Sequence, residues 1–229
     1  MAVYIAFSGD IHTRVLYAAT TVLNGMTAHW QGDHGSAMPP NIADALVTYL
    51  QVAVGTGSTL VSFNGAGFGF QILSAVSSLD LTRLVMGHTD IMAAFVADNG
   101  YMASLDSFAS VIRPGPKIPI VSWLDNPGGA LSACDATAAA IKMVHEMGEA
   151  RGLLVRKSKQ GKSCTWHIRG DLEVPPIKMA SLEDTLQKGT RPPAWVTRPV
   201  DPASLISWMH PPVQEPPLPS IAGFFDGSN

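Results

Sequence analysis

The chain has 229 residues, of which 46% are hydrophobic and 14% are charged, so it can bury a sizeable core in one domain, or in one domain with an extension. A formal net charge of -3 and a pI near 6.1 exclude a global basic field. Any nucleic-acid binding would therefore have to come from a local patch.

The N-terminal three strands are expected to form the start of a mixed sheet. Residues 3–7 predict a buried strand, and residues 14–23 predict a second strand that turns at Asn24-Gly25 into a third at 26–30. Asn41 can cap a helix that runs to about Val54, and a strand follows at 59–63. Because the strand after a helical crossover usually runs parallel to an earlier one, we expect an α/β fold with a mixed sheet flanked by helices.

Further helices and a hairpin follow along the chain. Apolar periodicity predicts helices at 67–78, 89–97 and 105–112 and a long one at 129–149, and residues 153–168 predict a hairpin that turns at Gln160-Gly161. We expect residues 1–170 to form one domain.

The composition changes after Gly170. Eleven of the 17 prolines lie in residues 171–229, so regular structure should be sparse there. We expect a proline-rich C-terminal extension that packs on the domain or on a protein partner. Its predicted buried anchors are Trp195, Trp208, Phe224 and Phe225.

Cysteine content and hydropathy favour a reducing compartment. Cys134 and Cys164 are too few and too far apart for a disulfide framework or a zinc cluster. No basic region followed by an apolar run opens the chain, and glycines and Asn64 break the most apolar stretch, residues 60–76. We expect a soluble cytoplasmic protein without membrane contact, in a cell, or in the host cytoplasm or virion if it is viral.

Several segments resemble a known family in their order and spacing. Residues 59–73, TLVSFNGAGFGFQIL, resemble the second motif of the RNase H-like (DnaQ-like) 3′–5′ exonucleases, especially phage and bacterial members with an NG-x-x-F-D frame. The similarity continues through residues 88–92, 104–108 and 115–117, then Trp123 and Cys134-Asp135, and covers most of residues 3–168. The ending at 207–211, SWMHP, is similar to the proline-rich tail of the phage-type proteins.

The resemblance implies a definite metal chemistry. These exonucleases hold two Mg²⁺ or Mn²⁺ ions with four carboxylates, and the ions activate water and stabilise the leaving oxygen. An Asp-x-Glu pair ends the first strand, an Asp follows the Asn-Gly turn, and an Asp on the late helix follows a Tyr or His that acts near the water.

This chain departs from that pattern at most of the acidic positions. The late helix keeps Asp135, but Leu131 and Ala130 stand where the family has its Tyr or His, and Gly69 replaces the second-motif Asp. Two alignments compete at the first motif, since either Asp10 and His12 or Ser8 and Asp10 occupy the acidic pair. Asp10 and Asp135 are thus relic catalytic positions, and Asp10, His12 and Asp135 could hold at most one weak ion. Asp10 could equally well only cap a turn.

One patch could track a phosphate backbone. Its candidate nucleic-acid-binding residues are Arg156, Lys157, Lys159 and Lys162, with Asn64 from the second motif. The alternatives are a solvated hairpin turn, whose lysines protect a sheet edge, and for Asn64 a purely structural turn in which Gly65 supplies a positive φ.

The leading hypothesis is therefore an exonuclease-fold protein that is inactive or impaired and is kept for binding or assembly, with single-stranded DNA or RNA as a possible partner. One alternative is an active single-metal exonuclease that recruits Asp10, Asp90 and Asp135 with His12. A second is a structural subunit of a virion or complex with no nucleic-acid role.

Overall fold

The computed structural model describes residues 1–33, 35–158, 160–169 and 174–209. Its centre is a mixed five-stranded sheet in the order β3-β2-β1-β4-β5. The strands β1 (Ala2–Asp10), β2 (Val15–Leu23) and β3 (Met26–Gln31) are antiparallel neighbours. β4 (Thr59–Ser62) and β5 (Thr89–Asp90) run parallel to β1 and to each other. The predicted mixed α/β sheet flanked by helices is confirmed.

The tight turn between β2 and β3 is confirmed as well. Asn24 and Gly25 both have positive φ, 54° and 76°, the conformation of a two-residue hairpin turn whose twist matches the strands. Leu23 pairs directly with Met26. This turn fixes the register of the meander.

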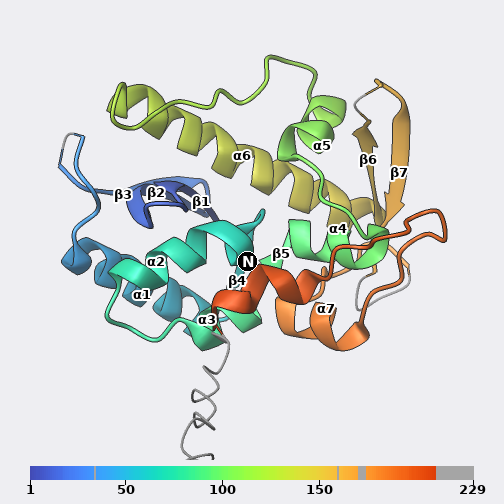
Figure 1. Cartoon of the computed structure of the whole chain (residues 1–229), viewed down its shortest axis with the longest axis horizontal. Helices are drawn as coiled ribbons and strands as arrows, with labels where there is room; N and C mark the ends of the chain where they lie inside the picture. Colours follow the sequence, from blue (N-terminus) through green and yellow to red (C-terminus); the bar gives the residue numbers. More distant parts are fainter. Residues whose placement is uncertain (34, 159, 170–173, 210–229) are drawn as a thin grey trace, which may run out of the picture.

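Helices cover both faces of the sheet, and each face has its own hydrophobic core. Alternate residues of β1 belong to one core or the other. Val3 and Ile5 face a core built with α1 (Pro40–Gly55) and α2 (Phe70–Val76), whereas Tyr4 and Ala6 face a core built with α6 (Pro127–Arg151). This alternation is the two-residue period of a strand. Figure 1 shows α6 on one side of the sheet and α1, α2 and α3 (Thr82–Gly87) on the other.

Local signals account for the limits of α6. Asn126 accepts a hydrogen bond from the backbone N–H of Gly129, Pro127 occupies the first helical turn, and Gly152 ends the helix with a φ of 68°. Most of its buried residues are small, namely four alanines, Cys134 and Gly148, and the larger ones are Ile141, Val144 and His145. The small side chains let α6 lie close to β1 and β2.

The remaining predicted elements are found with changed ends. α4 (Ile91–Asn99), α5 (Leu105–Ile112) and the hairpin of β6 (Leu153–Lys157) and β7 (Ser163–His167) agree with prediction. The helix expected at 67–78 instead begins as a π-helical turn, η1 (Gly65–Gly69), and continues as α2. Sequence periodicity missed α3 and β5.

The described part of the C-terminal extension contains more regular structure than predicted, namely α7 (Leu182–Lys188) and the 3-10 segment η2 (Pro202–Met209). Leu182 and Leu205 are buried in the same core as α1. Trp208 packs against that core and donates its indole N–H to the Ala66 carbonyl at 2.8 Å. The prediction of Trp195 as a buried anchor is wrong, because its side chain is 69% exposed. The anchors Phe224 and Phe225 lie outside the described residues.

Candidate functional site

The loop after β4 is organised by a buried carboxylate. Asp90, at the end of β5, accepts the backbone N–H of Asn64 and Ala66 at 2.9 Å, and it also caps α4 through Met92 and Ala93. Burial favours the neutral acid, but the His88 imidazole, whose Nε2 lies 3.6 Å from a carboxylate oxygen, and hydrogen bonds from the backbone of Ala66 and Asn64 hold the pKa of Asp90 below its ordinary value. A carboxylate surrounded in this way is a structural anchor, so its predicted recruitment as a metal ligand has no geometric support.

Asn64 shapes the loop itself. Its φ is 59°, in the left-handed region, whereas Gly65 has no positive φ. The expectation that Gly65 supplies the positive φ is therefore wrong. Glycine is required there for space, because a Cβ at this position would lie 2.7 Å from the Cβ of Ser62. The Asn64 side-chain oxygen is buried and has no hydrogen-bond partner among the described residues.

Position 69, where the exonucleases that the sequence resembles carry an acid, has no room for a side chain. A Cβ added to Gly69 would overlap the ring of Phe7 on β1. That ring packs edge-to-face against Phe70, with 5.2 Å between the centroids. An aromatic ring thus fills the space that a second-motif carboxylate would need.

Asp10 is used locally at the end of β1. Its carboxylate accepts the backbone N–H of His12 at 2.8 Å and of Thr13 at 3.4 Å. These hydrogen bonds, that of the His12 backbone first, lower the pKa of Asp10. The geometry is that of the turn cap offered as the alternative to a relic ligand.

Asp135 is held by different partners. Thr20 donates its hydroxyl to the Asp135 carboxylate at 2.8 Å, and His29 Nε2 lies 2.9 Å from the same oxygen. About two fifths of the Asp135 side chain is exposed, at 40%. The sequence did not identify Thr20 or His29 as neighbours of this acid, since only the pairing of β2 with β3 brings them together.

Strand register separates Asp10 from the partners of Asp135. Thr20, which holds Asp135, pairs with Ala6, whereas Asp10 lies four residues farther along β1 and pairs with Val15. At a rise of about 3.3 Å per residue this is roughly 13 Å along the strand, and ligands of one Mg²⁺ lie at about 2.1 Å from the ion.

The donor set therefore does not fit the paired ions that the resemblance implies. Among the described residues, no group of three or more His, Cys, Asp and Glu side chains could hold a metal ion. Leu131 packs against the small cluster of Ala18, Trp123 and Ala130, and its apolar side chain offers no base for a water.

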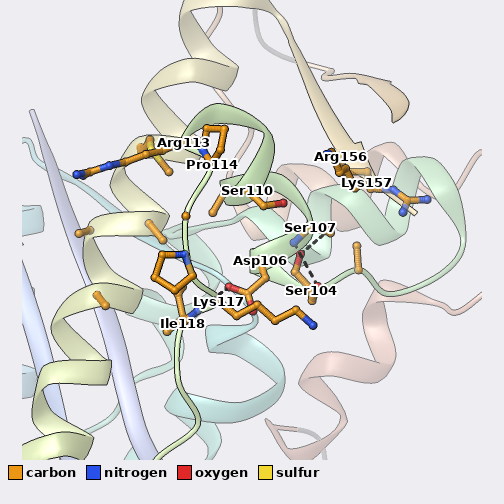
Figure 2. A pocket seen from close by; sticks show the side chains of 18 of the residues that line it. Ser104, Asp106, Ser107, Ser110, Arg113, Pro114, Lys117, Ile118, Arg156 and Lys157 are labelled. Carbon is orange, nitrogen blue, oxygen red and sulfur yellow. Dashed lines mark hydrogen bonds between the residues drawn. The ribbon is translucent and has the colours of Figure 1, made fainter. Parts of the chain in front are cut away.

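A separate groove lies between α5, the segment that follows it, α6 and the β6–β7 hairpin. Its volume is about 950 Å³, at the upper end of the range for ligand sites. Arg156 and Lys157 lie on the hairpin side, and Arg113 lies on the opposite side (Figure 2). Lys117 and Asp106 also line it. Among the described lining residues there are thus four cations and one carboxylate.

Of the predicted nucleic-acid-binding residues, the structure brings Arg156 and Lys157 into this groove. Lys162 is exposed at the hairpin, Lys159 lies outside the described residues, and Asn64 belongs to the loop after β4. Sequence reasoning missed Arg113 and Lys117. Their signal was weak, because they are single cations in a segment without regular structure, and only the fold sets them opposite the hairpin.

No protein-family model matches the chain, and no curated protein or solved structure is significantly similar to it. In the described part of the chain, no helix has the length and apolar character needed to cross a membrane.

The two regions differ in what they can do chemically. Asp10 at the end of β1 and Asp135 on α6 are separated carboxylates, and the Phe7 ring fills the space at position 69, so these groups can neither gather two divalent ions nor activate a water. The groove offers guanidinium and ammonium groups, which bind anions without chemistry of their own.

Proposed function

We propose that this protein is an RNase H-like exonuclease-fold protein that does not hydrolyse nucleic acid and acts by binding it. The observation that carries the proposal is the overlap that a Cβ at position 69 would make with the Phe7 ring. Loss of an acid by substitution alone would leave a space that a water or an ion could occupy. Here the protein fills that space with part of its core, so the site is closed as well as depleted of charge.

The fold supports the assignment to this superfamily. An N-terminal antiparallel meander is followed by parallel strands, with the Asn-Gly segment directly after β4. The late helix α6 packs across β1 and carries Asp135, as the resemblance implies for its last acid. The mixed sheet flanked by helices is what the resemblance predicts.

The electrostatics support the absence of hydrolysis. Two Mg²⁺ ions bring four positive charges into one site, and hard cations require several oxygen ligands. Asp10 and Asp135 supply two carboxylates that lie at different positions along the strands of the sheet. Each carboxylate already accepts hydrogen bonds from its own neighbours.

The partner in this proposal is single-stranded DNA or RNA, supported by the cations of the groove. A protein partner for the proline-rich extension remains a prediction, as does a cytoplasmic or virion location.

The test is a trimming assay with purified protein and 5′-labelled single-stranded DNA and RNA, in Mg²⁺ and in Mn²⁺. We expect no shortening beyond that seen with an Asp135→Asn variant, because no metal-activated water forms in either protein. Metal-dependent shortening by the wild-type protein that is lost in Asp135→Asn would contradict the proposal. The exposed Asp125→Asn variant controls for a general effect of removing one acid.

A further inference from the structure

We propose that the groove between α5, α6 and the β6–β7 hairpin is the binding site for the phosphate backbone of a single-stranded nucleic acid. This inference rests on the proposed function, in that it assigns a place to the binding that remains when hydrolysis is lost. Asp10, Gly69 and Asp135 are not among the described residues that line the groove. The groove therefore does not include these three positions, although it reaches Ala136, the neighbour of Asp135 in the chain.

The groove is more basic than the chain as a whole. The chain has 15 Lys and Arg against 18 Asp and Glu, yet the residues described as lining the groove include four cations and one acid. The single acid, Asp106, accepts the backbone N–H of Ile118 at 3.2 Å and so ties the segment after α5 to the helix. A basic concave surface on an acidic protein concentrates polyanions at that one place.

Three of the groove cations have no acidic partner among the described residues. In the described part of the chain, no carboxylate oxygen lies within 4.0 Å of the charged nitrogens of Arg113, Lys117 or Lys157. All three side chains are exposed. A phosphate that reaches them has no protein carboxylate to displace, and it releases the counterions that surround the nucleic acid.

Arg156 is held in place by two aromatic rings. Its guanidinium lies over the rings of Phe95 and Tyr101, 5.4 and 5.1 Å from their centroids, and donates a hydrogen bond to the Tyr101 hydroxyl. The aromatic rings hold the cation without neutralising it. The remaining guanidinium donors stay available for a phosphate.

The surface of the groove indicates how the strand is recognised. Ala139, Ala140 and Met143 of α6 form an apolar wall, and Ser104 and Ser110 of the α5 region add hydroxyls that can bond phosphate oxygens. No aromatic side chain is among the described lining residues, so bases have no stacking platform. Binding is therefore dominated by the backbone, with little preference for sequence and a strong dependence on salt.

The cations on opposite sides favour a nucleic acid over an acidic peptide. Arg113 at the end of α5 and Lys157 on β6 line one groove from different elements, and a chain that carries a charge at every unit can contact cations spaced apart in this way (Figure 2). An acidic helix presents its carboxylates mainly along one face. An acidic peptide is the alternative that the experiment must exclude.

The test compares a groove variant, Arg113→Gln/Lys117→Gln/Lys157→Gln, with a matched control, Arg83→Gln/Lys178→Gln/Arg198→Gln. Every substituted side chain is exposed, and each variant loses three charges. Arg156 stays unchanged because it packs on two rings. Circular dichroism and the urea midpoint establish that both variants are folded.

The measurement is fluorescence anisotropy with labelled oligo-dT and oligo-rU of about 15 nucleotides, a length within known site sizes, between about 50 and 200 mM salt. We expect the groove variant to bind at least about tenfold more weakly at the lower salt, and the slope of log K against log salt to fall by about 2. The control variant should bind more nearly like wild type. Poly-glutamate and mononucleotides should displace the oligonucleotide poorly at equal charge.

Each other outcome overturns the assignment. Equal weakening of the groove and control variants would show that only net charge matters. Displacement by poly-glutamate would indicate an acidic peptide ligand, and displacement by mononucleotides would indicate a small phosphate ligand. Wild-type protein that binds no oligonucleotide at the lower salt would also remove the nucleic-acid partner of the proposed function, which is a failure distinct from binding that ignores the groove.

Discussion

At the scale of single residues, the ring of Phe7 determines what position 69 can hold. Replacing Gly69 with Ala forces the whole ring to move, because the new Cβ would overlap its inner atoms as well as its edge. We expect Gly69→Ala to lower the free energy of unfolding by about 1–3 kcal/mol, the usual effect of overpacking. Urea unfolding followed by circular dichroism measures this change.

A double-mutant cycle isolates the contact with Phe7. In a Phe7→Ala background, Gly69→Ala should be less destabilising by roughly 1 kcal/mol or more, since the two positions touch. Gly55 is the control: it lies in α1 with no atom within 4 Å of an added Cβ, so Gly55→Ala should stabilise by about 0.5–1 kcal/mol. If Gly69→Ala lowers the free energy of unfolding equally with and without the Phe7 ring, then Phe7 does not fill the space at position 69.

At the scale of elements, Asp90 connects the loop after β4 with the start of α4. One oxygen accepts the N–H of Asn64, Met92 and Ala93, and the other accepts that of Ala66. In Asp90→Asn an amide N–H₂ replaces an acceptor and faces one of these donors. We expect a loss of about 1–3 kcal/mol in the free energy of unfolding at neutral pH, measured from the urea midpoint.

The same carboxylate predicts a dependence on pH. The pKa of Asp90 is lowered in the folded protein, so its contribution is complete above the unfolded value of about 3.9 and is lost as the pH falls toward the folded pKa. The stability difference between wild type and Asp90→Asn should therefore shrink in acid. The exposed Asp125→Asn substitution should give no such convergence, and a constant difference down to pH 3 would contradict the assignment.

At the scale of the whole molecule, the described part of the C-terminal extension shares a core with the N-terminal helices. Trp208 packs against that core and bonds the Ala66 carbonyl, and Leu205 is buried there. We expect Trp208→Ala to lower the free energy of unfolding by about 2–4 kcal/mol, seen as a lower urea midpoint of one cooperative transition. Trp195→Ala, at a side chain that is 69% exposed, should change stability by no more than about 0.5 kcal/mol. Two separate transitions, or an unchanged midpoint in Trp208→Ala, would show an independent extension.

Much of the fold could be predicted because its signals are local. The Asn24-Gly25 turn, the apolar period of residues 41–54 and the cap, proline and glycine around α6 each act within a few residues of the chain. α3 and β5 were missed because they are short, and β5 has only two residues, Thr89 and Asp90. α7 lies within a proline-rich segment, where composition alone argues against a helix.

The sequence by itself determined the mixed sheet, the order of most helices and the residue types at the positions compared with the exonuclease motifs, because residue type and periodicity are properties of the chain. Tertiary structure alone decided that Asp10 and Asp135 lie at different positions along the strands, that Phe7 fills the space at Gly69, and that Arg113 and Lys117 line the same groove as Lys157. These relations depend on strand register and on packing between distant segments. Their distances are set by the whole fold and leave no signature in neighbouring residues.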